Sequence, residues 1–297
     1  MYREFYGLAQ APFEMAPDPA FLYLGETHRE GLATLVYGVR SRKGFVLLTG
    51  EVGTGKTTLL HALLAQLDSS VASAFIFNPT LDPLGFLQVL FDDLGIQTPC
   101  RTKAEYLLTL NRFLIERLEN GQTTLLIIDE AQNLSPEMLE EVRLLSNLET
   151  PTAKLLQIML VGQPELNEIL GRPELRQLRQ RIVLRHQLQP FTSDEVEAYI
   201  EERLGFAGYS GKGIFKRSAR RAIFEVTGGL PRLINIVCDS ALLAGYAREQ
   251  TRLGADVIQE VARDLQLPDA REGDAAKAES ENGAPKQKRG GWFGLFG

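Results

Sequence analysis

One glycine-rich segment has the residue types needed to hold a phosphate group. Glycines let a backbone curl so that its N–H groups point at phosphate oxygens, and a helix beginning there adds a favourable field. In this pattern Lys56 reaches the terminal phosphates of ATP and the Thr57 hydroxyl binds Mg²⁺. The segment that would contact the nucleotide consists of Gly50, Glu51, Val52, Gly53, Thr54, Gly55, Lys56, Thr57 and Thr58.

The residues on either side of the segment support this prediction. An apolar run at Phe45–Thr49 precedes the glycines, and an amphipathic helical pattern over Thr57–Leu67 follows them. A strand before and a helix after distinguish a phosphate-binding loop from a chance match to the bare pattern. We therefore expect ATP and Mg²⁺ to bind here.

A second apolar run, Leu125–Ile128, ends in two acidic residues, Asp129 and Glu130. Charged residues directly after aliphatic ones are expected at the carboxyl edge of a parallel sheet, where ligands bind. There Asp129 would hold Mg²⁺ through water, and Glu130 would polarise an attacking water as a general base. The alternative is a strand end with two solvated acids, which the upstream phosphate loop disfavours.

Composition and charge narrow the class of protein. The 297 residues are 44% hydrophobic and 24% charged, which is ordinary for one or two globular domains. A net charge of −6 argues against a dedicated nucleic-acid partner. The N-terminus lacks the apolar core of a signal peptide, and no run approaches the roughly 18 apolar residues of a membrane span. A cytoplasmic location is expected.

Histidine and cysteine spacing gives no support to a transition-metal site. His28, His61 and His186 lack any metal-ligand spacing, and Cys100 and Cys238 belong to no CxxC pattern. The expected metal is therefore the Mg²⁺ of the phosphate site alone.

Five short apolar runs alternate with helical patterns up to about residue 190 and predict an α/β fold with a parallel sheet. Four runs are nearly continuous, as expected for strands covered on both faces, and the fifth alternates and is placed at a sheet edge. The runs are Gly44–Thr49, Val71–Phe77, Thr124–Asp129, Leu155–Gly162 and Ile182–Leu188.

From Phe191 to about Leu267 the pattern is purely helical and predicts a small all-helical lid domain. Thr192 and Glu195 have the spacing of a capping box, and Pro231 suits the first position of a helix. The remaining residues lose apolar periodicity, which is typical of a disordered linker. The expected domains are 1–190 for the P-loop core, 191–267 for the lid and 268–297 for the linker with its aromatic end.

The acidic pair and the helical stretch after the fifth strand resemble the AAA+ ATPases. The segments Asp129–Leu134 and Val161–Leu166, together with Phe5–Phe13, look like the ExeA/GspA-type ATPases of bacterial secretion and pilus assembly. The resemblance covers about residues 1–267. It implies a three-layer P-loop core with a helical lid, hydrolysis of ATP to ADP and phosphate, and assembly into a homo-oligomeric ring or dimer.

The same resemblance implies three further site residues. Gln163 corresponds to the sensor 1 position, which contacts the γ-phosphate or the attacking water. Arg181 corresponds to the arginine finger that a neighbouring subunit supplies, with Arg179 as the alternative. Arg232, after two glycines and a proline, corresponds to sensor 2, which would link the nucleotide to the angle between domains.

Two groups of aromatic residues leave alternatives open. Phe13, Phe21 and Tyr23 would line an adenine pocket or belong to a hydrophobic core. The segment Trp292–Phe296 follows basic residues and would dock on a protein partner or touch a membrane surface. A tail that folds back on the chain or contacts nothing is the alternative.

The resemblance implies an ATPase that works on a secretion, pilus or cell-envelope assembly apparatus, peripheral at the inner membrane through a partner or the tail. Two other functions stay open. A DNA-transaction ATPase of the TniB or MuB transposition type would need a basic DNA-tracking face, which the acidic balance disfavours. A scaffold that binds ATP without turnover is disfavoured by the intact pair of Asp129 and Glu130.

Overall fold

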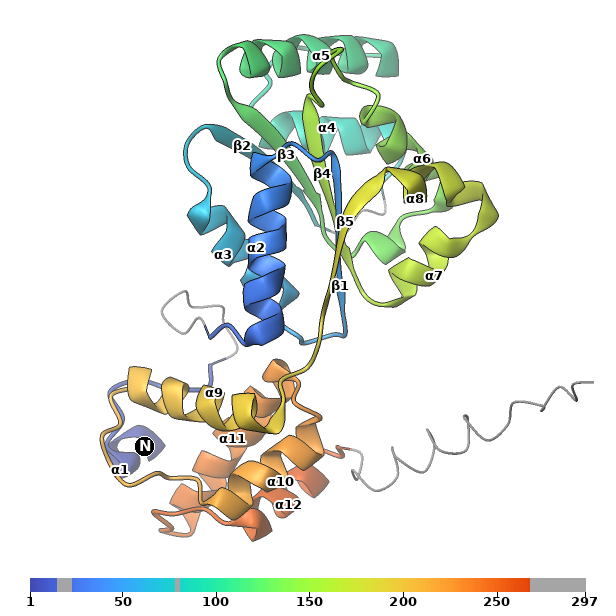
Figure 1. The fold of residues 1–297 in the computed structure, drawn as a ribbon. Coiled ribbons are helices and arrows are strands. Elements are labelled where there is room, and N and C mark those ends of the chain that lie inside the picture. Colours follow the sequence, from blue (N-terminus) through green and yellow to red (C-terminus); the bar gives the residue numbers. More distant parts are fainter. Residues whose placement is uncertain (15–22, 78–80, 268–297) are drawn as a thin grey trace, which may run out of the picture.

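The structure is a computed structural model that describes residues 1–14, 23–77 and 81–267. Phe21 and the aromatic segment Trp292–Phe296 lie outside these residues. The chain forms a sheet part with helices on both faces and a helical part beneath it (Figure 1). Among the described residues, no helix is both long and apolar enough to cross a membrane.

The sheet part contains five parallel strands in the order β2-β3-β4-β1-β5. Every side chain of β1 and β4 is buried, which explains their continuous apolar sequences. The strands are β1 (Phe45–Gly50), β2 (Val71–Ile76), β3 (Thr123–Ile128), β4 (Leu156–Gly162) and β5 (Ile182–Leu188).

The two edge strands differ in how well the sequence predicts them. Burial alternates along β5, and the prediction that Ile182–Leu188 lies at an edge is confirmed. The prediction that Val71–Phe77 is covered on both faces is wrong, because β2 is the other edge strand and only two of its side chains, those of Ala74 and Ile76, are buried. Apolar residues such as Phe75 can therefore lie at an edge without full cover.

Two layers of helices bury the faces of the sheet. One layer consists of α2 (Glu26–Arg40) and α3 (Lys56–Gln66). The other face is covered by α4 (Pro83–Asp93), α5 (Lys103–Glu119), the short helix η2 (Ala131–Asn133), α6 (Pro136–Leu145), α7 (Glu165–Gly171), η3 (Pro173–Leu175) and α8 (Arg176–Arg181).

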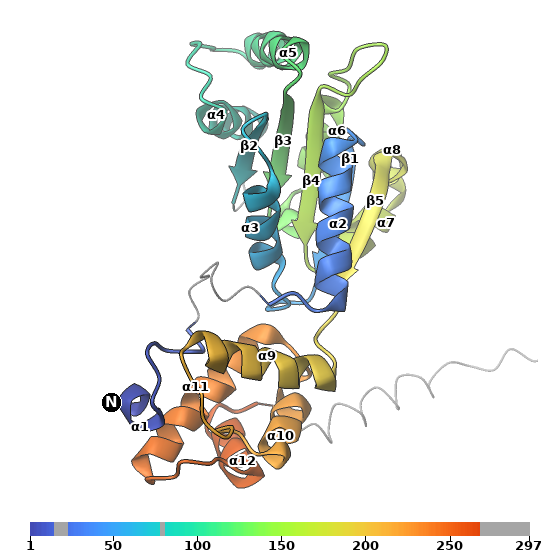
Figure 2. The same ribbon diagram turned by 60° about the vertical axis from the view of Figure 1, so that its left-hand side comes forward.

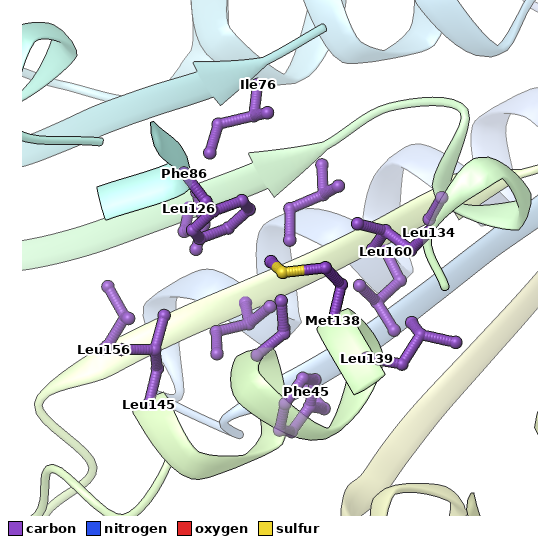
Figure 3. Close-up of a cluster of buried hydrophobic side chains, with 14 of the residues drawn as sticks. Phe45, Ile76, Phe86, Leu126, Leu134, Met138, Leu139, Leu145, Leu156 and Leu160 are labelled. Atoms are coloured by element: carbon purple, nitrogen blue, oxygen red, sulfur yellow. The ribbon is translucent and has the colours of Figure 1, made fainter. Parts of the chain in front are cut away.

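Figure 3 shows the larger of the two sheet cores, where Met138 and Leu139 of α6 lie beside side chains of the strands, including Leu126 and Leu160. A core of this size holds the strand ends in fixed positions, because interiors are close-packed. The loops that follow β1, β3 and β4 therefore have a rigid base.

The helical part consists of α9 (Ser193–Phe206), α10 (Arg217–Thr227), α11 (Pro231–Ala247) and α12 (Ala255–Asp264), joined by α1 (Tyr2–Tyr6) from the N-terminus. Its start is set by the predicted capping box, in which Thr192 and Glu195 each bond the other's backbone. Pro231 lies in the first turn of α11, as predicted.

The N-terminal residues pack with the helical part rather than with the sheet. Tyr6, Leu8 and Phe13 belong to the same buried cluster as α9 to α12. The division of the chain at residues 190 and 267 stays a prediction, and packing alone groups residues 2–13 with the helices.

The arrangement of the two parts places a site between them. Because all five strands are parallel, their carboxyl ends point the same way, towards the helical part (Figure 2). A backbone hydrogen bond of 2.9 Å from the Phe191 N–H to the Gly229 carbonyl holds the connection after β5 against the turn before α11. A second backbone bond, from the Arg232 N–H to the Gly53 carbonyl, holds the first turn of α11 against the loop after β1.

Candidate nucleotide site

A cavity of about 460 Å³ lies between the loop after β1 and the helical part. Its residues come from the N-terminal segment, α2, the loop after β1, the start of α3, the loop after β3, the connection after β5, α9 and α11. The sequence-predicted residues that line it are Val52, Gly53, Gly55, Lys56, Thr57, Thr58, Glu130 and Arg232.

The loop after β1 has the backbone that phosphate binding requires. Gly53 and Gly55 have φ angles of 83° and 95°, a region that side chains disfavour. The Thr54 hydroxyl donates to the Glu51 carbonyl at 2.8 Å and fixes the curl. Gly55 caps the N-terminus of α3, so the positive end of the helix dipole opens into the cavity.

Lys56 is buried at the start of α3. Its Nζ donates to the carbonyls of Gly50 and Glu51 at 2.7 and 3.0 Å. Burial lowers the pKa of Lys56, although the negative charges of Glu130 and Asp129 raise it in part. These partners keep the ammonium at the mouth of the loop, where it can meet a phosphate.

The acidic pair ends β3 as the sequence predicts, and its two members differ in setting. Asp129 is buried and accepts a bond from the Glu130 N–H at 2.9 Å, and burial raises its pKa. Glu130 has a left-handed backbone with φ 51°, which turns its side chain to the cavity. The left-handed region costs a residue other than glycine about 1–3 kcal/mol, so the surrounding structure must hold it.

Two glutamine amides hold the Glu130 carboxylate. Its Oε2 accepts from Gln132 Nε2 and from Gln163 Nε2, the latter at 3.2 Å. Gln132 Oε1 in turn accepts the Gln163 N–H at 3.1 Å, so the loops after β3 and β4 are tied together. The structure brings the predicted Gln163 to the predicted acid. Sequence reasoning missed Gln132, whose position two residues after Glu130 gives no signal of its own.

Arg232 brings the helical part against the phosphate loop. Its N–H donates to the Gly53 carbonyl at 3.2 Å, and its side chain lines the cavity. A Cβ at Gly53 would lie 2.9 Å from Arg232 Cβ, so the glycine permits this close approach. The predicted residue is therefore adjacent to the predicted loop.

The other end of the cavity is aromatic. Tyr23 lies edge-on to Phe191 and Tyr199, with ring centroids 5.3 and 5.6 Å apart, and all three residues line the cavity. Of the residues that the sequence left undecided, Tyr23 lines the cavity and Phe13 is buried in the helical core. Phe191 and Tyr199 were not predicted, because they come from the helical part.

Comparison with known proteins agrees with this geometry. Residues 39–170 match the family model described as AAA domain. General secretion pathway protein A from Aeromonas hydrophila is 45% identical over 249 residues, which are 84% of this chain and 45% of that protein. The chain contains an AAA domain and is a homologue of general secretion pathway protein A. It spans less than half the length of that relative.

Solved structures extend the likeness to the fold. Cdc6p from Pyrobaculum aerophilum matches with a TM-score of 0.65 at 19% identity, covering 84% of this chain and 71% of that one. Drosophila ORC, in a structure bound to DNA, matches with a TM-score of 0.67 at 15% identity, covering 96% and 69%. Identities this low establish the fold alone. The resemblance to AAA+ proteins and the predicted AAA+ P-loop fold are confirmed.

An AAA domain implies nucleotide binding. The described residues contain no group of three His, Cys, Asp or Glu side chains that would cage a metal. Mg²⁺ needs no such cage, because it is usually held by one or two carboxylates together with substrate phosphates. Of the two predicted ligands, Thr57 lines the cavity and Asp129 is buried directly after β3, and their role in holding Mg²⁺ stays a prediction.

The two candidate arginine fingers lie away from the cavity of their own AAA domain. Ile182, directly after Arg181, pairs with Phe45 at the start of β1, whereas the phosphate loop follows the end of β1. Arg181 donates to Ser146 Oγ, to Asn147 Oδ1 at 2.7 Å and to the Arg143 carbonyl at 3.4 Å.

Arg181 therefore caps the C-terminus of α6 in this conformation. Arg179 is exposed and donates to the Gly171 carbonyl at 3.3 Å. The predicted role of an arginine finger on a neighbouring subunit, and the choice between Arg181 and Arg179, both stay predictions.

Proposed function

We propose that this chain is a Mg²⁺-dependent ATPase that hydrolyses ATP to ADP and phosphate. The observation that carries the proposal is the meeting of Lys56, Glu130 and Arg232 around one cavity. They come from the loop after β1, the end of β3 and the first turn of α11, and only the tertiary structure brings them together. A phosphate-binding cation, an acid and a second cation are the set that phosphoryl transfer to water needs.

Each residue has a defined part in the proposed reaction. The backbone N–H groups of the loop after β1 and the Lys56 ammonium bind the phosphates. Thr57 and Asp129 would hold Mg²⁺, which would supply positive charge beside the phosphates. Glu130 orients the attacking water and accepts its proton, while Gln163 keeps that carboxylate in place.

Arg232 would sense the terminal phosphate from the helical part. Because its N–H is bonded to Gly53 and its side chain lines the cavity, a change at the phosphate reaches α11 directly. The angle between the parts would then follow the nucleotide state, which is how such an ATPase moves a partner.

An oligomer would complete the site. An arginine at the position of Arg181 or Arg179 can reach only a neighbour's phosphates, so a ring or dimer is expected. The name of the relative supports a place in a secretion or related envelope-assembly apparatus, with a partner there. We place the protein in the cytoplasm, peripheral at the inner membrane. The proposed docking segment Trp292–Phe296 lies outside the described residues.

ATP turnover across a protein concentration series tests the proposal. Turnover per subunit should rise with concentration. Glu130→Gln should bind ATP within about threefold of wild type and lower turnover at least about a hundredfold, because the general base is lost. Glu168→Gln, an exposed acid of α7, is the matched control and should keep wild-type turnover.

Arg181→Ala should also bind ATP and lose turnover if its finger role holds. Arg179→Ala separates the two arginines in the same assay. If the wild type binds ATP but shows no turnover at any concentration, the hydrolase proposal fails and the non-hydrolysing scaffold takes its place.

A further inference from the structure

The carbonyl groups of the phosphate loop need hydrogen-bond donors. A loop that turns its N–H groups towards phosphates turns its carbonyl groups outward, and a buried carbonyl must accept a hydrogen bond. The donors described above bind the carbonyls of Gly50, Glu51 and Gly53. Thr54 is fully buried, so water cannot satisfy its carbonyl.

His28 of α2 supplies the donor for Thr54. Its Nε2 lies 2.8 Å from the Thr54 carbonyl oxygen, which can only accept, so Nε2 carries the proton and donates. The residue is only 3% exposed, and burial lowers the pKa of His28 although the bond to Thr54 opposes the shift. Its Nδ1 is buried and has no partner among the described residues. The ring is therefore a neutral Nε2–H tautomer, and within the described structure its hydrogen bonding is directed at the phosphate loop alone.

The first turn of α2, which carries His28, is held from two sides. The Glu26 N–H donates to Glu195 Oε1 at 2.7 Å, and Glu195 belongs to the helical part. His186 Nε2 of β5 donates to the Thr27 carbonyl at 2.8 Å. The donor of His28 therefore has a fixed position beside the loop.

The bond to Thr54 determines how the next N–H points. The Thr54 carbonyl and the Gly55 N–H belong to one planar trans peptide and point in opposite directions. The Gly55 N–H donates to no other described residue, and Gly55 lines the cavity. Gly55 has a φ angle of 95° and no side chain, so its own backbone does not prevent this peptide from rotating. The orientation depends on the hydrogen bond to His28.

We propose that His28 is a positioning residue of the phosphate site, which holds the Thr54 carbonyl outward and thereby keeps the Gly55 N–H turned towards the phosphates. Without this donor the buried carbonyl would be unpaired, and rotation of the peptide would relieve it but turn the Gly55 N–H away. The inference rests on the proposed function, in which the cavity holds ATP. It gives His28 no contact with the nucleotide.

Equilibrium titrations of the full chain with ADP and ATP in the presence of Mg²⁺ test the inference. His28→Leu removes the donor and should weaken the binding of both nucleotides about tenfold, or about 1.4 kcal/mol. His28→Gln places an amide N–H near the position of Nε2 and should bind both within about threefold of wild type. His61→Leu, at an exposed histidine of α3, is the matched control and should keep wild-type affinity.

Nuclear magnetic resonance of the ¹⁵N-labelled chain gives a readout that a general loss of stability would not move. At saturating ADP the Gly55 amide resonance should shift in the wild type and in His28→Gln, and should shift far less in His28→Leu. The ¹⁵N shifts of the His28 ring in the wild type should report the Nε2–H tautomer, which is a test that needs no variant.

Wild-type affinity in His28→Leu, a full Gly55 shift in that variant, or an Nδ1–H tautomer in the wild type would overturn the positioning role and leave nucleotide binding intact. An equal loss of affinity in His28→Leu and His28→Gln would also overturn it, because glutamine retains the donor. A wild-type chain that binds neither nucleotide would instead overturn the proposed function. The two failures are therefore distinguishable.

Discussion

Glu130 is held by two amides that come from different loops, and this decides which way its carboxylate points. Gln163 follows β4 and Gln132 follows β3, and both donate to the same oxygen. The acid itself can be predicted from its place after four aliphatic residues. Its second partner cannot, because Gln132 becomes significant only when η2 carries it back towards β4.

Replacement of Gln132 should slow hydrolysis without weakening nucleotide binding. Gln132→Leu removes a bond to Glu130 and the bond to the Gln163 N–H, so the carboxylate loses its orientation. Misplacement of a catalytic group by about 1 Å costs up to roughly a hundredfold, and we expect turnover to fall about ten- to a hundredfold.

Single-turnover kinetics with an ATP-binding titration would measure both quantities. Gln259→Leu, on the exposed face of α12, is the control. Wild-type turnover in Gln132→Leu would mean that Gln163 alone orients the acid.

At the scale of elements, the turn between α10 and α11 sets where the helical part meets the sheet part. Gly228 and Gly229 have φ angles of 57° and 76°. A Cβ at Gly229 would lie 2.0 Å from the Phe191 carbonyl oxygen, whereas one at Gly228 would meet no atom within 4 Å. A substitution at Gly228 therefore introduces backbone strain alone, whereas one at Gly229 introduces backbone strain and a steric overlap.

Alanine substitutions at these glycines should differ in cost. Gly228→Ala carries only the left-handed backbone penalty, about 1 kcal/mol. Gly229→Ala adds the overlap with Phe191 and should lower the free energy of unfolding by about 3 kcal/mol or more. Urea unfolding of both variants measures the difference. Equal losses of unfolding free energy in the two variants would mean that the Phe191 backbone moves away from the added methyl group without cost.

The end of α6 depends on Arg181. The guanidinium bonds the last carbonyls and side chains of that helix, where a positive charge also favours the helix dipole. Arg181→Ala should therefore lower the free energy of unfolding by about 1 kcal/mol. Arg179→Ala, at an exposed position, should leave it within about 0.5 kcal/mol of wild type.

Chemical denaturation at a protein concentration too low for assembly would separate this local role from any role between subunits. Unchanged stability in Arg181→Ala would contradict the capping role.

At the scale of the whole molecule, one carboxylate joins the two parts. Glu195 of α9 accepts from the Thr192 N–H at 2.8 Å and from the Glu26 N–H at 2.7 Å. It thereby caps a helix of the helical part and the first turn of α2, which carries His28. Burial raises the pKa of Glu195, but these hydrogen bonds outweigh burial and leave the pKa below its ordinary value of 4.5.

The contribution of Glu195 should depend on pH in a defined direction. A carboxyl with a depressed folded pKa stabilises the fold above its unfolded pKa and loses that effect as pH falls through the folded value. Glu195→Ala should cost about 1 kcal/mol at pH 7. The difference in unfolding free energy between wild type and Glu195→Ala should narrow once the pH drops below 4.5.

Urea unfolding midpoints of the wild type and of Glu195→Ala at several pH values measure this difference in stability. Glu202→Gln, an exposed acid of α9, serves as the control. A gap that stays constant from pH 7 down to pH 4 would contradict the assigned bonds.

Local patterns predict the elements well and their assembly poorly. All five strands and the cap at Thr192 follow from apolar runs and short-range spacing. The packing of Phe13 with α9 to α12, and the cavity positions of Phe191 and Tyr199, depend on contacts between distant segments.

The packing of residues 2–13 has a structural consequence. Because Tyr6, Leu8 and Phe13 pack with α9 to α12, the helical part is built from two segments that are far apart in the sequence. Glu14 follows the first of these segments, Phe191 begins the second, and both residues line the cavity. Removal of the N-terminal residues would therefore open the core of the helical part and take away one wall residue of the cavity at the same time.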